Sequence, residues 1–372
     1  MIFDRQQFFR ALLTWFDRAR RDLPWRLPRV SPPGARLDPY HVLVSEAMLQ
    51  QTQVSTVIPY FDRFCRAFPT LKSLADADQQ QVLRLWQGLG YYSRARNLQQ
   101  AAKKILSDFG GKVPDTVDEL RSLPGVGRYT AGAIASIAFN KRAAILDGNV
   151  ARVLCRIDRI ETDPRDPPTR NALWQRAEEI LPEKPDRVGD FNSALMELGA
   201  IICTPRNPQC LICPVRQFCR ACADGVQDRI PAPRKSKVNP LEKRWTFCVW
   251  RRSRTSEKWL IEQRPATGRW AGMWQFVTLE ATKRKPSTTL LKRAMNLSAS
   301  GLQHAGTIHH ALTHRRYIFD VYTCRTSDGK LLKSDRPRVW IDLNELDRYP
   351  FPHPHLKIVQ LLQQRQTKQQ SR

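Results

Sequence analysis

Four cysteines lie within a 17-residue stretch of this 372-residue chain: Cys203, Cys210, Cys213 and Cys219, spaced C-x6-C-x2-C-x5-C. Thiolates set this closely can wrap one compact inorganic centre, which constrains the local backbone to a loop around it. Cys222 completes a second C-x2-C pair and so introduces zinc as an alternative, although zinc ribbons usually separate such pairs by about 15–20 residues. From the residues alone, an iron–sulfur cluster and a zinc ion both remain open.

The chain carries a formal net charge of +26, and the excess is not confined to one end. Lys and Arg outnumber Asp and Glu by 25 to 10 over residues 240–372 and by 36 to 25 over residues 1–239. A field of this sign favours phosphate backbones and predicts binding that weakens steeply with salt. Charge alone does not distinguish a nucleic-acid-binding protein from one that is merely basic and highly soluble.

The sequence gives no sign of a membrane or of secretion. No apolar run reaches the roughly 18 residues that a membrane helix needs, and charges interrupt every apolar stretch near the N-terminus. Nine cysteines without a secretion signal indicate a reducing compartment, in which disulfides are rare. We therefore expect a cytoplasmic, nucleoid-associated protein in a bacterium, or a nuclear or mitochondrial one in a eukaryote.

Hydrophobic periodicity divides the chain into two parts. Residues 1–222 repeat apolar side chains at helical spacing without strand alternation, whereas residues 223–244 are basic and contain three prolines, which is typical of a linker. The fold prediction is a mainly α domain over 1–222, a smaller α+β domain over 245–363 and a polar tail over 364–372. In the second domain we expect strands at Trp245–Trp250, Trp259–Ile261, Trp274–Leu279, Arg316–Cys324 and Val339–Ile341, and helices at Thr288–Asn296 and His355–Gln363.

Two carboxylates lie at positions where burial or local geometry suits them to a role in catalysis. Glu46 follows Val42 and Leu43 by four and three residues, on the apolar side of an expected helix, where burial would raise its pKa and let it donate a proton near neutral pH. A buried salt bridge is the alternative role. Asp147 ends the apolar run 143–146 and precedes a new helix, which indicates an N-cap; backbone N–H groups would also keep it ionised and able to face a developing cation.

The turn Leu123–Gly127 separates two expected helices, 117–122 and 128–139. Its two glycines allow positive φ and close backbone approach, and the N-terminus of the following helix offers unpaired N–H groups. Such a turn can hold a DNA phosphate without reading a base. A plain helix–turn–helix corner explains the same residues equally well.

Four segments occur in one order along the chain: SEAMLQQTQV, LPGVGRYTAGAIASIAF, ILDGNVARVLCR and then the four cysteines. This order closely resembles the adenine DNA glycosylases of the MutY type, within the helix–hairpin–helix glycosylase superfamily. The resemblance covers roughly residues 4–222 strongly and roughly 240–360 more loosely. It implies a two-lobed helix–hairpin–helix domain with an iron–sulfur loop over 203–219, a [4Fe–4S] cluster on the four cysteines, and a smaller α+β Nudix-like domain.

The same resemblance implies roles for individual residues in removing a flipped adenine. Glu46 matches the acid that protonates the leaving base, most simply at N7, and Asp147 matches the carboxylate that stabilises or captures the oxocarbenium-like sugar. Tyr129 and Asn149 match supporting positions. The residues matched to DNA contacts are Gln51 and Tyr91 as wedges and Gly125, Val126 and Gly127 as the phosphate-binding hairpin; those matched to the adenine pocket wall are Trp25 and Arg26.

One position separates members of the superfamily. Endonuclease III-type relatives carry a lysine just after the hairpin, which forms a Schiff base and cleaves the backbone. Tyr129 stands there in this chain, and the neighbouring Arg128 stays protonated and is a poor nucleophile. We therefore predict base removal without strong strand cleavage. The rival interpretations are a bifunctional glycosylase/lyase for oxidised pyrimidines and a DNA-binding relative that has lost catalysis.

The C-terminal part resembles the family's Nudix-like domain, which senses 8-oxoguanine opposite the adenine. Residues 282–297 contain no Asp or Glu, so the acidic metal-binding helix of a Nudix hydrolase is missing and nucleotide hydrolysis is not expected. His310–His314 aligns with the family's lesion-reading loop, with Leu312 and Thr313 replacing the usual Phe and Ser. Thr313 and His314 are carried over as DNA contacts, and an ordinary solvated β-turn is the alternative.

Two further departures concern the adenine pocket. The segment Leu27–Leu37 is longer than the family usually shows, and Ser193 stands where the family often has Gln or Glu near the base. The predicted function is a monofunctional glycosylase acting on adenine opposite 8-oxoguanine or guanine. Its expected partner is double-stranded DNA containing an adenine mispair, and we expect it to act as a monomer.

Overall fold

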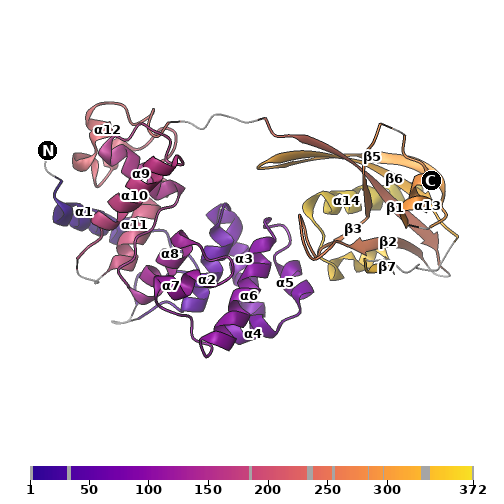
Figure 1. Ribbon diagram of the computed structural model, residues 1–372, viewed down its shortest axis with the longest axis horizontal. Coiled ribbons are helices and arrows are strands. Elements are labelled where there is room, and N and C mark those ends of the chain that lie inside the picture. Colours follow the sequence, from indigo (N-terminus) through magenta and orange to yellow (C-terminus); the bar gives the residue numbers. More distant parts are fainter. Residues whose placement is uncertain are drawn as a thin grey trace. The chain divides into compact units, whose positions relative to one another are not determined.

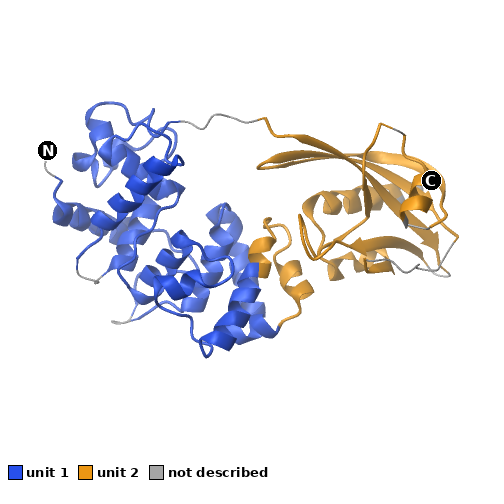
Figure 2. Cartoon of the chain, viewed as in Figure 1, with its two compact units in different colours: residues 1–76, 97–236 blue, residues 77–96, 237–372 orange. Residues whose placement is uncertain are grey.

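The computed structural model describes residues 3–31, 35–183, 187–232, 238–253, 256–283, 285–295, 297–327 and 336–370. Two compact units divide the chain, one comprising Met1–Asp76 and Asn97–Ser236 and the other Ala77–Arg96 and Lys237–Arg372 (Figure 2). The segment 77–96 thus groups with the C-terminal part, whereas the sequence assigned it to the helical domain. The predicted division at residues 222 and 245 stays a prediction.

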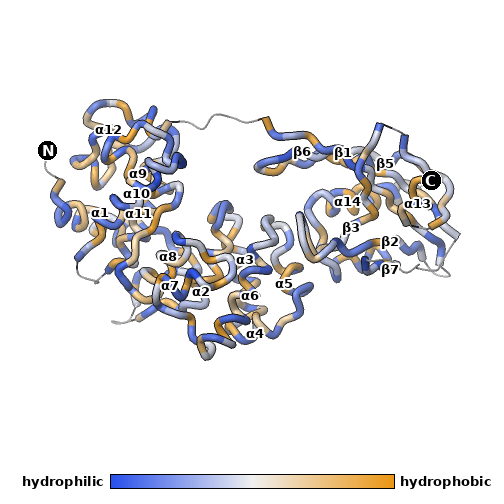
Figure 3. Tube along the Cα trace, viewed as in Figure 1, coloured by the Kyte–Doolittle hydropathy of each residue, from blue (hydrophilic) through white to orange (hydrophobic). Residues whose placement is uncertain are grey.

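The first unit consists of helices, as its periodicity predicts. Their bounds are α1 Arg5–Ala19, α2 Pro39–Leu49, α3 Val54–Ala67, α4 Leu71–Asp76, α6 Ser93–Asp108 (whose first four residues belong to the other unit), α7 Val117–Arg121, α8 Arg128–Phe139, α9 Gly148–Asp158, α10 Pro167–Glu179, α11 Val188–Ile201 and α12 Arg220–Ala223, with short 3-10 turns η1 Cys210–Ile212 and η2 Arg216–Phe218 (Figure 1). Apolar and hydrophilic stretches alternate along these helices (Figure 3).

Capping and apolar stripes explain why the helices at the centre of this unit begin where they do. Asp38 caps α2, and Pro39 occupies its first position, where a missing N–H costs no hydrogen bond. Asp147 caps α9 by accepting a hydrogen bond from the Val150 N–H, which confirms the predicted N-cap. The apolar side of α9 is buried in a core shared with α1, α10 and α11, and consists of Val150, Val153, Leu154 and Ile157.

Helix α8 packs against the segment that leads to α9 at a distance only glycine permits. A Cβ on Gly132 would lie 2.3 Å from the carbonyl oxygen of Ala144, so any side chain there would push the two segments apart. Gly199 on α11 makes a similar approach, because its Cβ would lie 2.7 Å from the Cβ of Asn149. These contacts fix the N-terminal turn of α9 between α8 and α11.

The second unit is a mixed seven-stranded sheet. Its strands are β1 Leu241–Arg252, β2 Glu257–Gln263, β3 Trp274–Gln275, β4 Val277–Glu280, β5 Ser300–Leu312, β6 Arg315–Arg325 and β7 Arg338–Ile341. The order is β3-β2-β1-β6-β5, with β4 pairing β1 and β7 pairing β2. Among the described strands, only β1 and β6 run parallel. Helices α13 Thr288–Met295 and α14 His353–Gln370 contribute to apolar cores on opposite faces of the sheet.

Two features of this unit differ from the sequence prediction. Strand β5 was not predicted, because its residues are polar and glycine-containing and most of them are exposed, so no apolar alternation marks it. Helix α14 continues to Gln370, where a polar tail was expected from residue 364. A chain rich in Gln and Lys can remain helical without an apolar face, since both residues have good helix propensity.

Segment 77–96 joins this unit through hydrogen bonds from α5 Gln79–Leu85 and the turn after it. The Gln80 amide accepts from the Trp274 indole at 3.1 Å and donates to the Gly272 carbonyl at 3.1 Å. The side chain of Gln87 accepts from the Phe351 N–H at 2.9 Å. These contacts join residues that lie between 192 and 264 positions apart, which is why sequence periodicity did not reveal them.

Candidate active site

The two carboxylates singled out in the sequence line one pocket of about 180 Å³ in the helical unit. Glu46 comes from α2, Asp147 from the N-cap of α9, and Tyr129 and Asn149 from the first turns of α8 and α9. Trp25 and Arg26, the predicted pocket wall, line the same space. The structure therefore brings together all six side chains that the sequence assigned to catalysis and to the base pocket.

Glu46 is a buried acid with few polar partners. Glu46 is 5% exposed. Burial raises its pKa to about 7, although a hydrogen bond with Tyr129 acts in the opposite direction. The nearby charge of Asp147 raises the pKa further. This is the direction predicted from the position of Glu46 on the apolar side of its helix.

Tyr129 connects Glu46 to the opposite wall of the pocket. Its hydroxyl hydrogen-bonds with Glu46 and donates to the sulfur of Met196 at 3.2 Å. Burial, together with the two neighbouring carboxylates, raises the pKa of Tyr129 well above its usual value, so the phenol stays protonated. A tyrosine with one hydroxyl between a carboxyl group and a weak sulfur acceptor can hold Glu46 in either protonation state.

Asp147 has a more polar environment than Glu46. It accepts hydrogen bonds from the Val150 N–H at 2.7 Å and from the Asn149 amide at 3.1 Å. Burial raises its pKa, while these hydrogen bonds and the charge of Arg152 oppose the rise. The sequence anticipated the hydrogen bonds but not the extent of burial.

Arg152 extends the polar contacts of Asn149 toward the cysteine loop. It donates to the Asn149 side chain at 2.9 Å, to the Gly199 carbonyl at 2.6 Å and to the Cys203 carbonyl at 2.8 Å. The N-terminal turn of α9 is thereby fixed to the first cysteine of the loop. Sequence analysis did not assign Arg152 a role.

Glu197 was also missed, and it organises the pocket wall. Its carboxylate is 1% exposed and binds Arg21 at 2.7 Å and Arg26 at 2.9 Å. Burial alone would raise its pKa, but the hydrogen bonds and charge of Arg21 and Arg26 lower it to about 2. The only sequence signal was an acid within the apolar run ALMELGA of α11. Trp25 is buried beside this cluster and meets Phe61 edge-on, with ring centroids 5.4 Å apart.

The predicted hairpin has the geometry of a tight turn between α7 and α8. Gly125 adopts φ +79°, and a Cβ there would lie 2.7 Å from the Cβ of Asn97, so both backbone conformation and space require glycine. Gly127 is the N-cap of α8 and supplies no side-chain cap, which leaves the first-turn N–H groups available. Val126, between them, is buried.

The two predicted wedge residues both have positive φ, which non-glycine residues adopt rarely. Gln51 has φ +56° and is exposed just after α2. Tyr91, in the second unit, has φ +47° and is 44% exposed. Its hydroxyl hydrogen-bonds with the hydroxyl of Thr313. Thr313 and His314 form the exposed turn between β5 and β6, so the segment predicted as a loop is the tip of a long hairpin.

The four cysteines line one pocket of the first unit, on the segment that follows α11. Among the residues with described positions, no group of three His, Cys, Asp or Glu side chains lies close enough to hold a single metal ion. Arg156 is 2% exposed, donates to the Cys203 sulfur at 3.2 Å and forms no ion pair with a described carboxylate. Burying a cation without an acid is costly, and an anionic cluster held by thiolates would compensate it. The residues therefore fit an iron–sulfur cluster.

Comparisons with known proteins agree with this geometry. Residues 44–179 match the HhH-GPD superfamily of base excision DNA repair proteins, residues 203–219 the iron–sulfur binding domain of endonuclease III, and residues 246–361 the NUDIX domain. A solved thermostable thymine-DNA glycosylase is 32% identical, with a TM-score of 0.51, and the match covers 59% of this chain and 97% of that one.

Some relatives match this chain over most of its length. An adenine DNA glycosylase of Rattus norvegicus is 41% identical over 368 residues, covering 87% of this chain and 71% of the relative. The Homo sapiens adenine DNA glycosylase is 39% identical, covering 84% and 66%, and that of Buchnera aphidicola subsp. Baizongia pistaciae is 31% identical, covering 95% of both chains.

A helical hairpin domain with a buried acid pocket, an iron–sulfur loop and a C-terminal NUDIX domain defines a DNA glycosylase of base excision repair. The chain carries the 4Fe–4S cofactor of the endonuclease III-type domain. Its extended similarity to the relatives above places it in one branch of that class: the chain belongs to the adenine DNA glycosylase family. It is a hydrolase acting on N-glycosyl bonds, with DNA as its substrate. None of its described helices is both long and apolar enough to span a bilayer.

Proposed function

We propose that the enzyme removes adenine paired with 8-oxoguanine or guanine by acid-assisted hydrolysis and leaves the DNA strand intact. The observation that carries this proposal is the presence of Glu46 and Asp147 in one pocket with different polar surroundings. An acid that keeps its proton near neutral pH and a second carboxylate supplied with N–H donors are the two groups that glycosidic hydrolysis needs.

The reaction begins when an adenine leaves the duplex and enters the pocket beside Trp25. Glu46 donates its proton to N7 of the base, while the Tyr129 hydroxyl holds the carboxyl group in place. The N9–C1′ bond then breaks, and its electron pair goes to the base. Asp147 stabilises the positive charge that develops on the sugar. Water then adds to C1′ and gives a proton to the Glu46 carboxylate, which restores the acid and leaves adenine and an abasic site.

The DNA contacts follow from backbone geometry and charge. Gly125–Gly127 and the free N–H groups of α8 hold a phosphate of the strand that carries the adenine. Gln51 and Tyr91, held in unusual conformations, occupy the stack at the lesion. The hydrogen bond between Tyr91 and Thr313 supports a joint role in reading the base opposite adenine, with His314 beside them on the same turn.

Single-turnover excision from duplexes with adenine opposite 8-oxoguanine, guanine or thymine tests the proposed substrate. We expect Glu46→Gln to lower the rate by about 10²- to 10⁴-fold, the usual contribution of a general acid. Glu183→Gln is the matched control, because that glutamate is 77% exposed and lies outside the pocket. Full activity of the Glu46→Gln enzyme would remove Glu46 from the mechanism.

Two further measurements separate the rival reactions. Efficient borohydride trapping of the enzyme on DNA would indicate a Schiff-base lyase and contradict the strand-preserving mechanism. Thr313→Ala should reduce the preference for 8-oxoguanine over guanine, whereas Thr307→Ala, on the exposed part of β5, should leave it unchanged. An unchanged preference in the Thr313 variant would exclude this residue from lesion recognition.

A further inference from the structure

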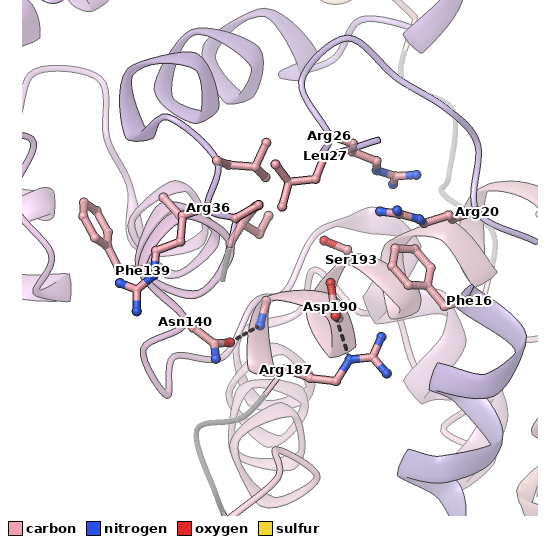
Figure 4. A pocket seen from close by; sticks show the side chains of 15 residues that line it. Phe16, Arg20, Arg26, Leu27, Arg36, Phe139, Asn140, Arg187, Asp190 and Ser193 are labelled. Carbon is pink, nitrogen blue, oxygen red and sulfur yellow. Dashed lines mark hydrogen bonds and ion pairs between the residues drawn. The ribbon is translucent and has the colours of Figure 1, made fainter. Parts of the chain in front are cut away.

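The first unit has other pockets besides the candidate active site. In one of about 290 Å³, Asp190 is already paired with Arg187 (Figure 4). The pocket that the cysteines line differs, because it has one thiol more than the four predicted to bind the cluster. The residues that share it are Cys203, Cys210, Cys213, Cys219 and Cys222. The match to the iron–sulfur binding domain ends at residue 219, so it assigns no role to Cys222.

Three of the four predicted ligands are held on the inner side of this pocket. Cys203, Cys213 and Cys219 pack against the apolar core of the helical unit. The Cys203 sulfur accepts a hydrogen bond from Arg156 at 3.2 Å, and the Cys219 sulfur lies 3.4 Å from the Arg156 carbonyl oxygen. The surrounding helices therefore position these three sulfurs.

The remaining ligand, Cys210, is held less firmly. It begins the 3-10 turn η1, and none of the three residues of this turn is buried. Leu211 and Ile212, which follow it, are 85% and 63% exposed. The core that holds the other three cysteines does not include Cys210 among its described members. A ligand on a surface turn with so little packing is the one that separates most easily from its iron.

Cys222 lies beside this outer ligand. The side chains of Cys222 and Cys210 are hydrogen-bonded to each other, and the Cys222 backbone N–H donates to the sulfur of Cys219. Cys222 belongs to α12, and its neighbour Ala221 is fully buried in the same core as the three inner cysteines. An anchored turn thus carries a fifth thiol within hydrogen-bonding reach of Cys210.

From this juxtaposition we propose that Cys222 is a reserve ligand of the iron–sulfur cluster, which binds the iron of Cys210 when Cys210 leaves it. In the exchange, the Cys222 thiol loses a proton and its thiolate forms a bond with the iron. The bond between the iron and Cys210 breaks, and the Cys210 thiolate takes up a proton, so no electron is transferred.

The consequence is better retention of the cluster. A ligand tethered to the same chain rebinds at an effective concentration of the order of millimolar. An iron that has lost Cys210 is therefore recaptured by Cys222 before it leaves the protein. This role concerns the cofactor and does not depend on which base the enzyme removes.

Iron content and visible absorption of purified variants test the exchange directly. We expect Cys210→Ala to keep at least about half of the natural protein's iron, and Cys210→Ala/Cys222→Ala to keep less than about a tenth. Alanine is used because, unlike serine, it has no oxygen that could bind iron. Cys203→Ala is the matched control, since it removes an inner ligand, and we expect it to lose the cluster although Cys222 is present.

A second measurement leaves all four predicted ligands in place. Cys222→Ala should contain as much iron as the natural protein, but an excess of an iron chelator should remove that iron at least about threefold faster. Cys65→Ala is the control for removal of a thiol, because Cys65 is a partly exposed free cysteine of α3 outside the cysteine pocket. Its rate of iron loss should equal that of the natural protein.

Three results would each overturn the proposal. Equal iron contents in Cys210→Ala and in the double variant would show that Cys222 does not replace Cys210. Equal rates of iron loss from Cys222→Ala and the natural protein would show that Cys222 does not recapture iron. A low iron content in Cys222→Ala before chelation would make Cys222 a permanent ligand and not a reserve. Because iron is measured and not excision, none of these results depends on the proposed function.

Discussion

The raised pKa of Glu46 predicts that a substitution which destroys catalysis also stabilises the protein, in a manner that depends on pH. The pKa is about 7 in the folded chain against an ordinary value of 4.5. Below pH 4.5 both states are protonated and Glu46 carries no penalty. As pH rises from 4.5 toward 7, the unfolded chain loses this proton while the folded chain keeps it, so stability falls; above pH 7 the loss is complete.

The magnitude follows from the shift. One pKa unit corresponds to about 1.4 kcal/mol, so the full penalty is about 3 kcal/mol, of which about 1 kcal/mol is present at pH 5.5. Gln has the shape of the protonated acid and no charge to bury. We therefore expect Glu46→Gln to exceed the natural protein in stability by about 2 kcal/mol more at pH 8.5 than at pH 5.5.

Urea denaturation of the full chain at both pH values, followed by tryptophan fluorescence, measures this difference. Glu183→Gln is again the control, because its exposed carboxylate should give no pH-dependent gain. A stability difference between Glu46→Gln and the natural protein that is the same at both pH values would refute the reasoning. So would a Glu46→Gln protein that is the less stable one at pH 8.5.

Three further predictions concern the pH dependence of catalysis, the iron–sulfur cluster and the hairpin turn. The single-turnover rate on adenine opposite 8-oxoguanine should fall as pH rises through about 7, where Glu46 loses its proton, and the residual rate of Glu46→Gln should lack this fall. A rate of the natural enzyme that stays constant up to pH 9 would contradict this prediction. Arg156→Met should lower the retention of the cluster, because it removes the one donor to the Cys203 sulfur among the described residues. Visible absorption and iron content measure the retention, and full iron content in the variant would argue against that role. Gly125→Ala should weaken binding to duplex DNA more than Gly110→Ala does, because both glycines have positive φ but only Gly125 has a neighbour within 3 Å of the added Cβ. Equal losses of affinity in filter binding would mean that backbone strain alone explains the effect.

Local sequence patterns were sufficient to predict the helices of the first unit and the residues at which α8 and α9 begin. The helical periodicity of residues 1–222 and the cap Asp147 are short-range features, and both are found where predicted. The burial of Glu46 followed from its position three and four residues after Leu43 and Val42. Strand β5 could not be found in this way, because Ala305 is its only described residue that is buried and its pairing with β6 is not visible in the sequence of the strand itself.

The residues that sequence analysis missed act across long separations. Glu197 matters because Arg21 and Arg26, more than 170 positions earlier, converge on it. Arg152 matters because it meets Cys203, and Gln80 because it meets Trp274. None of these pairs has a fixed spacing that a single sequence could reveal. Only the packing of the helices and the sheet creates them.

The environments of Glu46 and Asp147 explain how two acids in one pocket can take different roles. Both are pushed toward the neutral form by burial, and each raises the cost of charging the other. The difference lies in their donors: Glu46 has the Tyr129 hydroxyl, whereas Asp147 has the Val150 N–H, the Asn149 amide and the nearby charge of Arg152. We therefore expect a proton shared between them to reside on Glu46. In the proposed mechanism this leaves the negative charge at the end of the pocket where the sugar becomes cationic and the proton at the end where the base leaves.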